Sequence, residues 1–545
     1  MTIPEILLKN AALYGDETCL AEINPEFKEE KGLPWKEFAL VETETDNAYR
    51  REITWNGFNG KASQFANLLL ERGVKRDSKV GILLMNCLEW LPAYFGVLRS
   101  GAVVVPLNFR YSSEEIEYCL ELAEVTTLVF GPEFVGRIDA IKDRIPNVKT
   151  LLFIGDGCPG FAEDYKALTD AESAESPNIT LDEADDAAIY FSSGTTGFPK
   201  AILHSHLSLY TACLVEQNHH GQSRDDKFLC IPPLYHTGAK MHWFGSFLAG
   251  SGAVLLRGIK PKWIIETAAK EKATIVWLLV PWAQDILDAI ERGEINLNEY
   301  DLSGWRLMHI GAQPVPPSLI TRWLKHFPNH EYDTNYGLSE SSGPGAVHLG
   351  VENIRKVGAI GKAGYRWQTR IVDEKGVDVN AGDVGELILK GDSVMKRYYR
   401  DPAATAVSLK DGWLYTGDMA KEDPDGFIFL VDRKKDVIIT GGENLYPVQI
   451  EDFLRGFGKI KDTAVIGIAD ERLGEIAAAI IEIKEGMDCT EGEIMEYCEQ
   501  LPRYKRPRTI IFDKIPRNPT GKIEKPKLRE QYAGGSVVAK QVGNK

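Results

Sequence analysis

Residues 79–130 read KVGILLMNCLEWLPAYFGVLRSGAVVVPLNFRYSSEEIEYCLELAEVTTLVF, and in them short apolar runs alternate with longer amphipathic runs. This alternation is typical of βαβ units, in which helices flank a parallel sheet. Ser112 and Ser113 are candidates for a helix N-cap, and four apolar residues follow at the spacing i, i+3, i+4 and i+7 of one helix face. These four are Ile116, Cys119, Leu120 and Ala123. The stretch therefore predicts an α/β fold.

The same pattern extends outward along most of the chain. It begins near Thr54, resumes after Asp186 and continues to about Glu331, where residues 264–280 (IIETAAKEKATIVWLLV) form one helix-then-strand unit. We therefore expect a large N-terminal domain made of βαβ-type subdomains.

The sequence pattern changes after about residue 358. From there to about residue 430, short β-rich runs are separated by Gly and Asp turn residues. This indicates a β-rich subdomain. Residues 464–483 predict a strand, a turn and a strand, and a helix is expected near residues 491–500. The predicted boundaries are an N-terminal domain over 1–432, a hinge at 433–435, and a small mobile α/β C-terminal domain over 436–545 with a frayed tail from about 533.

Bulk properties exclude several classes of protein. A chain of 545 residues is too long for one hydrophobic core, and its 44% hydrophobic and 26% charged residues are ordinary for a soluble multidomain enzyme. The net charge of −16 disfavours binding to nucleic acid or to anionic membranes, both of which need basic surface.

Targeting and redox signals point to the cytoplasm. The N-terminus lacks a basic leader followed by an apolar core, and the most apolar stretch, residues 274–283, is shorter than the roughly 20 residues of a membrane span. The eight cysteines are scattered without a CxxC pair, which predicts reduced thiols and no structural zinc.

The strongest chemical signal is YFSSGTTGFPK at residues 190–200. Its glycines permit a tight backbone turn, and its hydroxyls and lysine offer donors and positive charge to phosphate oxygens. The GxxxxGK[ST] spacing of a Walker A loop is missing here and at Gly521-Lys522, so a P-loop NTPase is disfavoured. Taken alone, the segment would fit an ordinary solvated turn equally well.

The run SSGTTGFPK resembles the phosphate-binding signature of the adenylate-forming superfamily, which includes acyl-CoA synthetases, luciferases and the adenylation domains of peptide synthetases. Further similar segments follow in the family's order over nearly the whole chain. The resemblance implies an AMP-forming acyl-CoA synthetase, which uses ATP, Mg²⁺ and coenzyme A to convert a carboxylic acid into an acyl-CoA, AMP and pyrophosphate through a reversible acyl-adenylate step.

The resemblance also implies a nucleotide site. Tyr336 would stack on adenine, Ser339 stands where threonine is commoner, and Asp418 would accept hydrogen bonds from the ribose hydroxyls. The implied ATP- and AMP-binding residues are Ser192, Ser193, Gly194, Thr195, Thr196, Gly197, Lys200, Gly311, Ala312, Gln313, Asn335, Tyr336, Gly337, Ser339, Asp418, Arg433 and Lys522.

Four residues are implied to carry the chemistry. Glu340, with Thr195, would hold Mg²⁺, since a hard cation prefers oxygen ligands and needs few of them beside ATP phosphates. Lys522, in the loop PRNPTGK, would neutralise the phosphoryl group during adenylation. His236, in PPLYHTG, would border the acyl site. A packed core histidine remains an alternative for His236, and a surface charge is the alternative for an isolated lysine or glutamate.

The second half-reaction implies a moving domain. Lys435 falls at the family's hinge, and Gly441, Gly442 and Glu443 resemble a loop that approaches coenzyme A after the small domain turns. The acyl pocket is expected to include His236, Trp243, Gly311 and Gly337.

Two rival functions remain open from the sequence: an enzyme that loads a carrier protein or acts as a luciferase-like oxygenase, and a catalytically silent nucleotide-binding homologue. Trp243 and the small residues 343–346 favour an apolar acid that is aromatic, alicyclic or of medium chain length. A homodimer is among the assemblies open to the chain.

Overall fold

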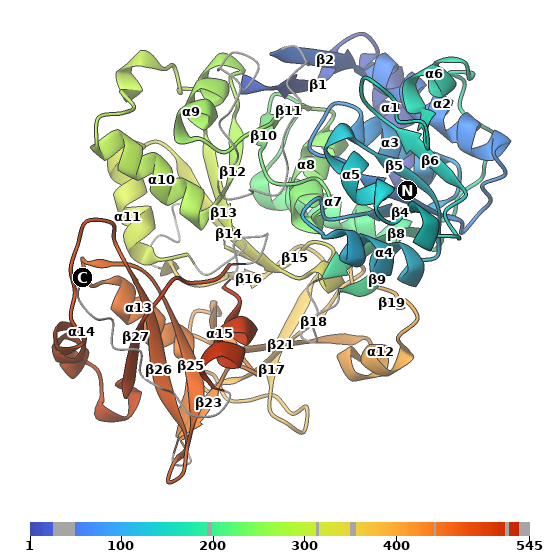
Figure 1. Cartoon of the computed structure of the whole chain (residues 1–545). Coiled ribbons are helices and arrows are strands. Elements are labelled where there is room, and N and C mark those ends of the chain that lie inside the picture. The colour runs from blue at the N-terminus through green and yellow to red at the C-terminus, as the bar shows by residue number, and fades with distance from the viewer. Residues whose placement is uncertain are drawn as a thin grey trace. The chain divides into compact units, whose positions relative to one another are not determined.

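The computed structural model describes residues 1–25, 49–192, 199–311, 315–348, 356–440, 443–517 and 523–533. Within these ranges, the side chains of residues 238–243, 443, 444 and 504 are not described. The chain divides into two compact units (Figure 1). The first unit comprises Met1–Gly311, Pro317–Thr369 and Leu389–Tyr415, and the second comprises Ala312–Pro316, Arg370–Ile388 and Thr416–Lys545. The predicted boundary at 433–435 remains a prediction.

The first unit contains an eight-stranded sheet. Its order is β19 (Arg397–Tyr398), β9 (Lys200–Ser205), β8 (Asp186–Ser192), β4 (Val103–Pro106), β3 (Lys79–Leu83), β5 (Val125–Phe130), β6 (Thr150–Phe153) and β7 (Glu163–Asp164). The apolar runs within residues 79–130 supply three of its strands, β3, β4 and β5. The strands from β8 to β7 along this order are parallel, whereas β9 pairs antiparallel with β8. The predicted parallel sheet is confirmed.

A nine-stranded sheet lies in the same unit. Its order is β16 (Lys362–Ala363), β15 (Pro344–His348), β14 (Glu331–Gly337), β13 (Leu307–Gly311), β12 (Ile275–Leu279), β10 (Lys227–Cys230), β11 (Gly252–Leu256), β1 (Thr18–Ile23) and β2 (Arg50–Thr54). Strands β10 to β14 are parallel, so their carboxyl ends meet at one edge. Ligands commonly bind at such an edge in α/β proteins.

Helices cover these sheets. They are α1 (Ile3–Tyr14), α2 (Trp55–Glu71), α3 (Trp90–Arg99), α4 (Ser113–Leu122), α5 (Val135–Asp139), α6 (Tyr165–Asp170), α7 (His206–His220), α8 (Thr237–Ala249), α9 (Pro261–Lys270), α10 (Val280–Glu291), α11 (Pro317–His326) and α12 (Pro402–Ser408). Figure 1 shows α9, α10 and α11 along one side of β12–β14, with α7 and α8 on the other.

The predicted helix beginning at Ser112 is confirmed as α4. The Ser112 hydroxyl accepts a hydrogen bond from Glu115 N, and the Glu115 carboxylate accepts one from Ser112 N, which forms a capping box. Ile116, Cys119 and Leu120 of this helix are fully or almost fully buried. Hydrophobic periodicity was therefore sufficient to place this element.

The main core of the first unit is aromatic and lies between helices and both sheets. Phe95 of α3 packs against Phe58 of α2 and against Phe244 and Phe247 of α8, with ring centroids 5.1 to 5.8 Å apart. Aromatic pairs at such separations contribute roughly 0.5–1.5 kcal/mol each beyond their buried area. This packing fixes α8, which follows the segment that carries His236.

Two five-stranded sheets complete the fold, as the β-rich and C-terminal patterns predict. One has the order β17 (Gln368–Val372), β18 (Gly385–Lys390), β21 (Trp413–Glu422) and β20 (Leu409–Lys410), with β22 (Ile428–Arg433) paired to β21. The other has the order β24 (Glu443–Leu445), β23 (Ile438–Thr440), β26 (Gly474–Ile483) and β25 (Ile460–Asp470), with β27 (Thr509–Phe512) paired to β26.

The C-terminal helices are α13 (Pro447–Arg455), α14 (Glu491–Tyr497) and α15 (Lys525–Tyr532). The β25–β26 hairpin and α14 confirm the predictions for residues 464–483 and 491–500. All eight cysteines are free thiols. Among the described residues, no helix has the length and apolar character needed to cross a bilayer.

Candidate functional site

The predicted phosphate loop lies between two paired strands. Ser192 ends β8, Lys200 begins β9, and these two residues are register partners in an antiparallel pair, so residues 193–199 connect the two strands of a hairpin. Five predicted phosphate-binding residues lie outside the described residues: Ser193, Gly194, Thr195, Thr196 and Gly197.

Lys200 and Glu340 lie against the same tyrosine. The hydroxyl of Tyr398, in β19, donates a hydrogen bond of 2.8 Å to Glu340 Oε1, and Lys200 Nζ lies 4.9 Å from the centre of the Tyr398 ring. Burial raises the pKa of Tyr398 above its usual range, and the Glu340 carboxylate raises it further. Tyr398 therefore stays protonated and remains a donor to Glu340.

The backbone around Glu340 is anchored from two other elements. Met395 N donates a hydrogen bond of 2.7 Å to Glu340 O, and His204 Nε2 of β9 donates one of 2.8 Å to Ser339 O. The structure thus fixes both predicted residues, Ser339 and Glu340, against the strand that begins with Lys200. Tyr398 and His204 were not predicted, because nothing in their local sequence marks them.

The carboxyl ends of β13 and β14 hold the next group of predicted residues. Gly311 ends β13, and Asn335, Tyr336 and Gly337 end β14. Asn335 Nδ2 donates a hydrogen bond of 3.1 Å to Glu216 Oε1 of α7. Ala312 and Gln313 lie outside the described residues.

Gly337 occupies a position that excludes a side chain. A Cβ there would lie 2.6 Å from the carbonyl oxygen of Gly343, on the turn between β14 and β15. Tyr336, its neighbour, is buried. The close approach of the two backbone segments therefore explains a glycine directly after the predicted adenine-stacking residue.

A buried asparagine fixes the segment that precedes His236. Asn86, just after β3, accepts a hydrogen bond of 2.8 Å from Leu234 N and donates one of 2.9 Å to Pro232 O. His236 itself is half-buried, and its backbone N donates to Pro233 O. No local pattern predicted a role for Asn86. The side chain of Trp243, in α8, is not described.

In the second unit, the two predicted ribose-site residues come together. Asp418 of β21 and Arg433 of β22 are register partners, with 3.5 Å between Arg433 Nε and Asp418 Oδ1. Glu386 supports the turn beside them by accepting a hydrogen bond of 3.0 Å from Gly417 N, and Gly417 has a φ of +73°. Such a backbone conformation favours glycine, as the YTGD motif provides.

The residues flanking the predicted hinge are tied to nearby elements of the second unit. Asp432 is buried and accepts a hydrogen bond of 3.0 Å from Val448 N, while burial raises its pKa to about 6 against the opposing charge of Lys525. Asp436 accepts a hydrogen bond of 2.7 Å from Arg529 of α15. The Lys435 side chain between them is exposed.

The ends of the loop that carries Lys522 are held together. Arg517 and Ile523 form an isolated antiparallel bridge, and Glu524 N donates a hydrogen bond of 2.8 Å to Pro516 O. Lys522 itself lies outside the described residues, as do Gly441 and Gly442, and the side chain of Glu443 is not described.

Comparison with known proteins identifies two family domains. Residues 34–399 match the model of the AMP-binding enzyme family, and residues 449–522 match that of the AMP-binding enzyme C-terminal domain. The long-chain-fatty-acid–CoA ligase FadD13 of Mycobacterium tuberculosis is 32% identical over 505 residues, covering 91% of this chain and 95% of the relative.

Two further proteins agree with this comparison. The indoleacetate–CoA ligase of Aromatoleum aromaticum is 32% identical over 489 residues, covering 89% of this chain and 94% of the relative. The fold is similar to that of the anthranilate CoA ligase AuaEII crystallised with anthranoyl-AMP, with a TM-score of 0.85, 24% identity and 97% coverage of both chains.

Proposed function

The chain belongs to the AMP-binding enzyme family and is an ATP-dependent acid:CoA ligase that works through an acyl-adenylate, and from this premise we propose the roles of its residues. In the first half-reaction a substrate carboxylate oxygen attacks the α-phosphorus of ATP and pyrophosphate leaves. In the second, the sulfur of coenzyme A attacks the acyl carbonyl, its proton is lost, and AMP leaves.

The first proposal concerns the phosphates and Mg²⁺. Two contacts of Tyr398 support it. Tyr398 touches both the Glu340 carboxylate and the Lys200 ammonium group, so both charged groups lie beside the phosphate-loop hairpin. Ser192 to Gly197 and Lys200 would bind the phosphate oxygens. Glu340, with one oxygen held by Tyr398, would offer its other oxygen to Mg²⁺ together with Thr195. When bound, Mg²⁺ would neutralise phosphate charge.

The second proposal concerns the nucleoside. Gly311, Asn335, Tyr336 and Gly337 would bind adenine, together with Ala312 and Gln313, and Ser339 would contact phosphate. Gly311 and Asn335 lie at the carboxyl ends of the parallel strands β13 and β14, and this edge of a parallel sheet commonly binds nucleotides. Asp418 would accept hydrogen bonds from the ribose diol, and Arg433, paired with it, would orient that carboxylate and reach the nucleotide.

The third proposal concerns the alternation between the half-reactions. Lys522 would stabilise the charge on the α-phosphoryl group during adenylation. The domain after the 433–435 hinge would then rotate about Lys435, so that Gly441, Gly442 and Glu443 approach coenzyme A. The bridge between Arg517 and Ile523 supports this role for Lys522, because it pairs the two residues that flank the segment containing this lysine.

The fourth proposal concerns the acid. His236, Trp243, Gly311 and Gly337 would line its pocket, and the acid would be aromatic, alicyclic or medium-chain. The acids named for relatives support an apolar substrate: a long-chain fatty acid, indoleacetate and, for an Amycolatopsis enzyme 30% identical over 484 residues, ferulate. We also place the enzyme in the cytoplasm, which suits its eight free thiols.

Pyrophosphate release tests these assignments. The purified chain is given ATP, Mg²⁺ and each member of a panel of aromatic, alicyclic and aliphatic acids, first without and then with coenzyme A. We expect one of the three apolar classes to release pyrophosphate and, with coenzyme A, to form a thioester. Activity confined to short polar acids would contradict the substrate proposal and leave the family assignment intact.

A further inference from the structure

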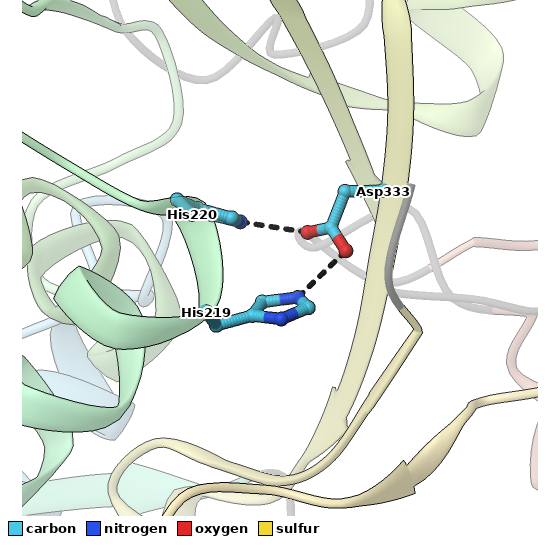
Figure 2. Close-up of side chains that lie close together, drawn as sticks. All are labelled: His219, His220 and Asp333. Carbon is cyan, nitrogen blue, oxygen red and sulfur yellow. Dashed lines mark hydrogen bonds and ion pairs between the residues drawn. The ribbon is translucent and has the colours of Figure 1, made fainter. Parts of the chain in front are cut away.

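Three imidazoles converge on one carboxylate inside the first unit. His219 and His220 are the last two residues of α7, His309 lies in β13, and Asp333 lies in β14. Figure 2 shows His219 and His220 directed at the two oxygens of the Asp333 side chain. None of the four belongs to the site proposed above.

The contacts within this cluster are short and buried. His219 Nε2 lies 2.6 Å from Asp333 Oδ1, while His220 Nε2 and His309 Nδ1 each lie 2.6 Å from Asp333 Oδ2. Every one of these side chains is at most 2% exposed. The cluster is therefore sealed from solvent by the protein around it.

Local structure explains why these side chains meet. His309 and Asp333 are register partners on adjacent parallel strands, so their side chains lie on the same face of the sheet. Helix α7 ends directly after His220 because Gly221 adopts a left-handed conformation with a φ of +55°. Two consecutive histidines at that helix end thus reach the same carboxylate.

The cluster buries two carboxyl groups. Asp333 is 2% exposed and contacts three imidazoles. Glu216 is fully buried as well, and its Oε2 lies 3.6 Å from His220 Nδ1. Two buried carboxylates are costly unless positive charge offsets them.

The ligand atoms of three of these residues lie close enough to share one ion. One ring nitrogen each of His219 and His220 and one carboxylate oxygen of Asp333 all lie within 4.8 Å of one another. Imidazole nitrogens and carboxylate oxygens are the ligands that a divalent transition metal such as zinc accepts.

We propose that His219, His220, His309 and Asp333 bind one divalent transition-metal ion, for which Zn²⁺ is the best match. Three imidazole nitrogens and one carboxylate oxygen form a four-coordinate set of the type that zinc favours. Metal–ligand bonds of about 2.0–2.1 Å in a tetrahedron separate the ligand atoms by roughly 3.3 Å, so the present contacts would open by roughly 0.7 Å. His309 is not among the three residues whose ligand atoms already lie within 4.8 Å of one another, so its ring must move further than theirs to bind the ion.

The surroundings of His220 match those of a metal-bound histidine. Its second ring nitrogen, Nδ1, faces the carboxylate oxygen Oε2 of Glu216 at 3.6 Å. Such outer partners orient a ligating imidazole and raise its basicity. Because all four ligands come from the protein and are buried, the site is a closed structural one.

The proposed ion would join α7 to the two strands that lead into the nucleotide site. β13 continues from His309 to Gly311, and β14 continues from Asp333 to Asn335 and Tyr336. The scattered cysteines predicted no structural zinc, but this site uses no cysteine, and its ligands are too far apart in sequence to form a recognisable motif.

Metal binding by the full-length enzyme tests the proposal. The protein is treated with a chelator, dialysed and titrated with Zn²⁺ against a chromophoric chelator. We expect one Zn²⁺ per chain and at least roughly 10²-fold weaker binding in Asp333→Asn and His220→Gln. His330→Asn, which changes a buried histidine outside the cluster, should bind Zn²⁺ like the parent. Parent-like binding by Asp333→Asn and His220→Gln, or no binding by the parent, would overturn the proposal.

Two measurements on the unaltered chain keep the test decisive if those variants fail to fold. Co²⁺ should replace Zn²⁺ and give the visible absorption of a tetrahedral site. Crystals soaked with Zn²⁺ should show an anomalous peak among the four side chains. A chain that gives neither signal holds this cluster together with protons alone, and the proposal is then wrong.

Discussion

The hydroxyl of Tyr398 donates a hydrogen bond of 2.8 Å to the carboxylate of Glu340, 58 positions away in the chain. The ring of the same tyrosine lies under the ammonium group of Lys200. One aromatic side chain therefore positions both the proposed Mg²⁺ ligand and the lysine beside the phosphate loop.

Replacing Tyr398 by phenylalanine removes only the hydrogen bond, because the ring beneath Lys200 remains. A hydrogen bond to a charged group contributes about 1.5–3 kcal/mol, so we expect kcat/KM for ATP to fall by at least roughly tenfold. The Mg²⁺ concentration needed for half-maximal pyrophosphate release should rise as well. Tyr399→Phe is the matched control, since the Tyr399 hydroxyl bonds to Glu124 instead. An unchanged Mg²⁺ dependence in Tyr398→Phe would show that Tyr398 does not position the ligand.

Lys522→Ala separates the two half-reactions. Loss of one electrostatic donor to a transition state costs roughly 10²- to 10³-fold, and we expect that loss in acid-dependent pyrophosphate release. Thioester formation from coenzyme A and presynthesised acyl-AMP should change far less, because the lysine is then no longer needed at the phosphoryl group. The control is Lys527→Ala, which removes an exposed lysine of α15 that pairs with Glu524. Equal loss in both half-reactions would contradict the proposed role.

Asp418→Asn tests the ribose contact. The amide keeps the size of the carboxylate but loses the charge and one acceptor, so KM for ATP should rise roughly tenfold or more. The same substitution should cost less with 2′-deoxy-ATP, which lacks one of the two hydroxyls. If the variant loses equally with both nucleotides, Asp418 acts through Arg433 or through folding and does not bind the diol.

Elements defined by neighbouring residues could be predicted from the sequence, whereas contacts between distant residues could not. Helix α4 and the β25–β26 hairpin follow from periodicity and turn residues that lie within a few positions of one another. Asn86 could not be predicted, because its partner Leu234 is 148 positions away and no pattern around either residue marks the pairing.

The same contrast separates the motifs from the histidine cluster. The phosphate-loop hairpin, Glu340 and Asp418 are recognised by short motifs, whereas His220 and Asp333 of the cluster are 113 positions apart. Only folding brings the end of α7 to β13 and β14. Side-chain partners that are distant in sequence therefore could not be predicted from the sequence alone.

Two buried histidines of the first unit make its stability depend on acid. Burial lowers the pKa of His206, at the start of α7, to about 4, and it lowers the pKa of His330 to about 4. In the unfolded chain each imidazole takes up its proton near pH 6.5. Between pH 6.5 and 4 the unfolded state therefore binds more protons than the folded state, and the free energy of unfolding falls as the pH falls.

His330→Asn isolates one of these contributions. Trp323 Nε1 donates a hydrogen bond of 3.4 Å to His330 Nδ1, and the oxygen of an asparagine amide offers a similar acceptor without a titratable group. The variant loses packing at every pH, but its free energy of unfolding should fall less than that of the parent between pH 7 and 4.5, by roughly 2 kcal/mol. Thermal unfolding of both proteins across this range measures it. Parallel curves would mean that His330 is protonated in the folded state and that its burial does not exclude the charge.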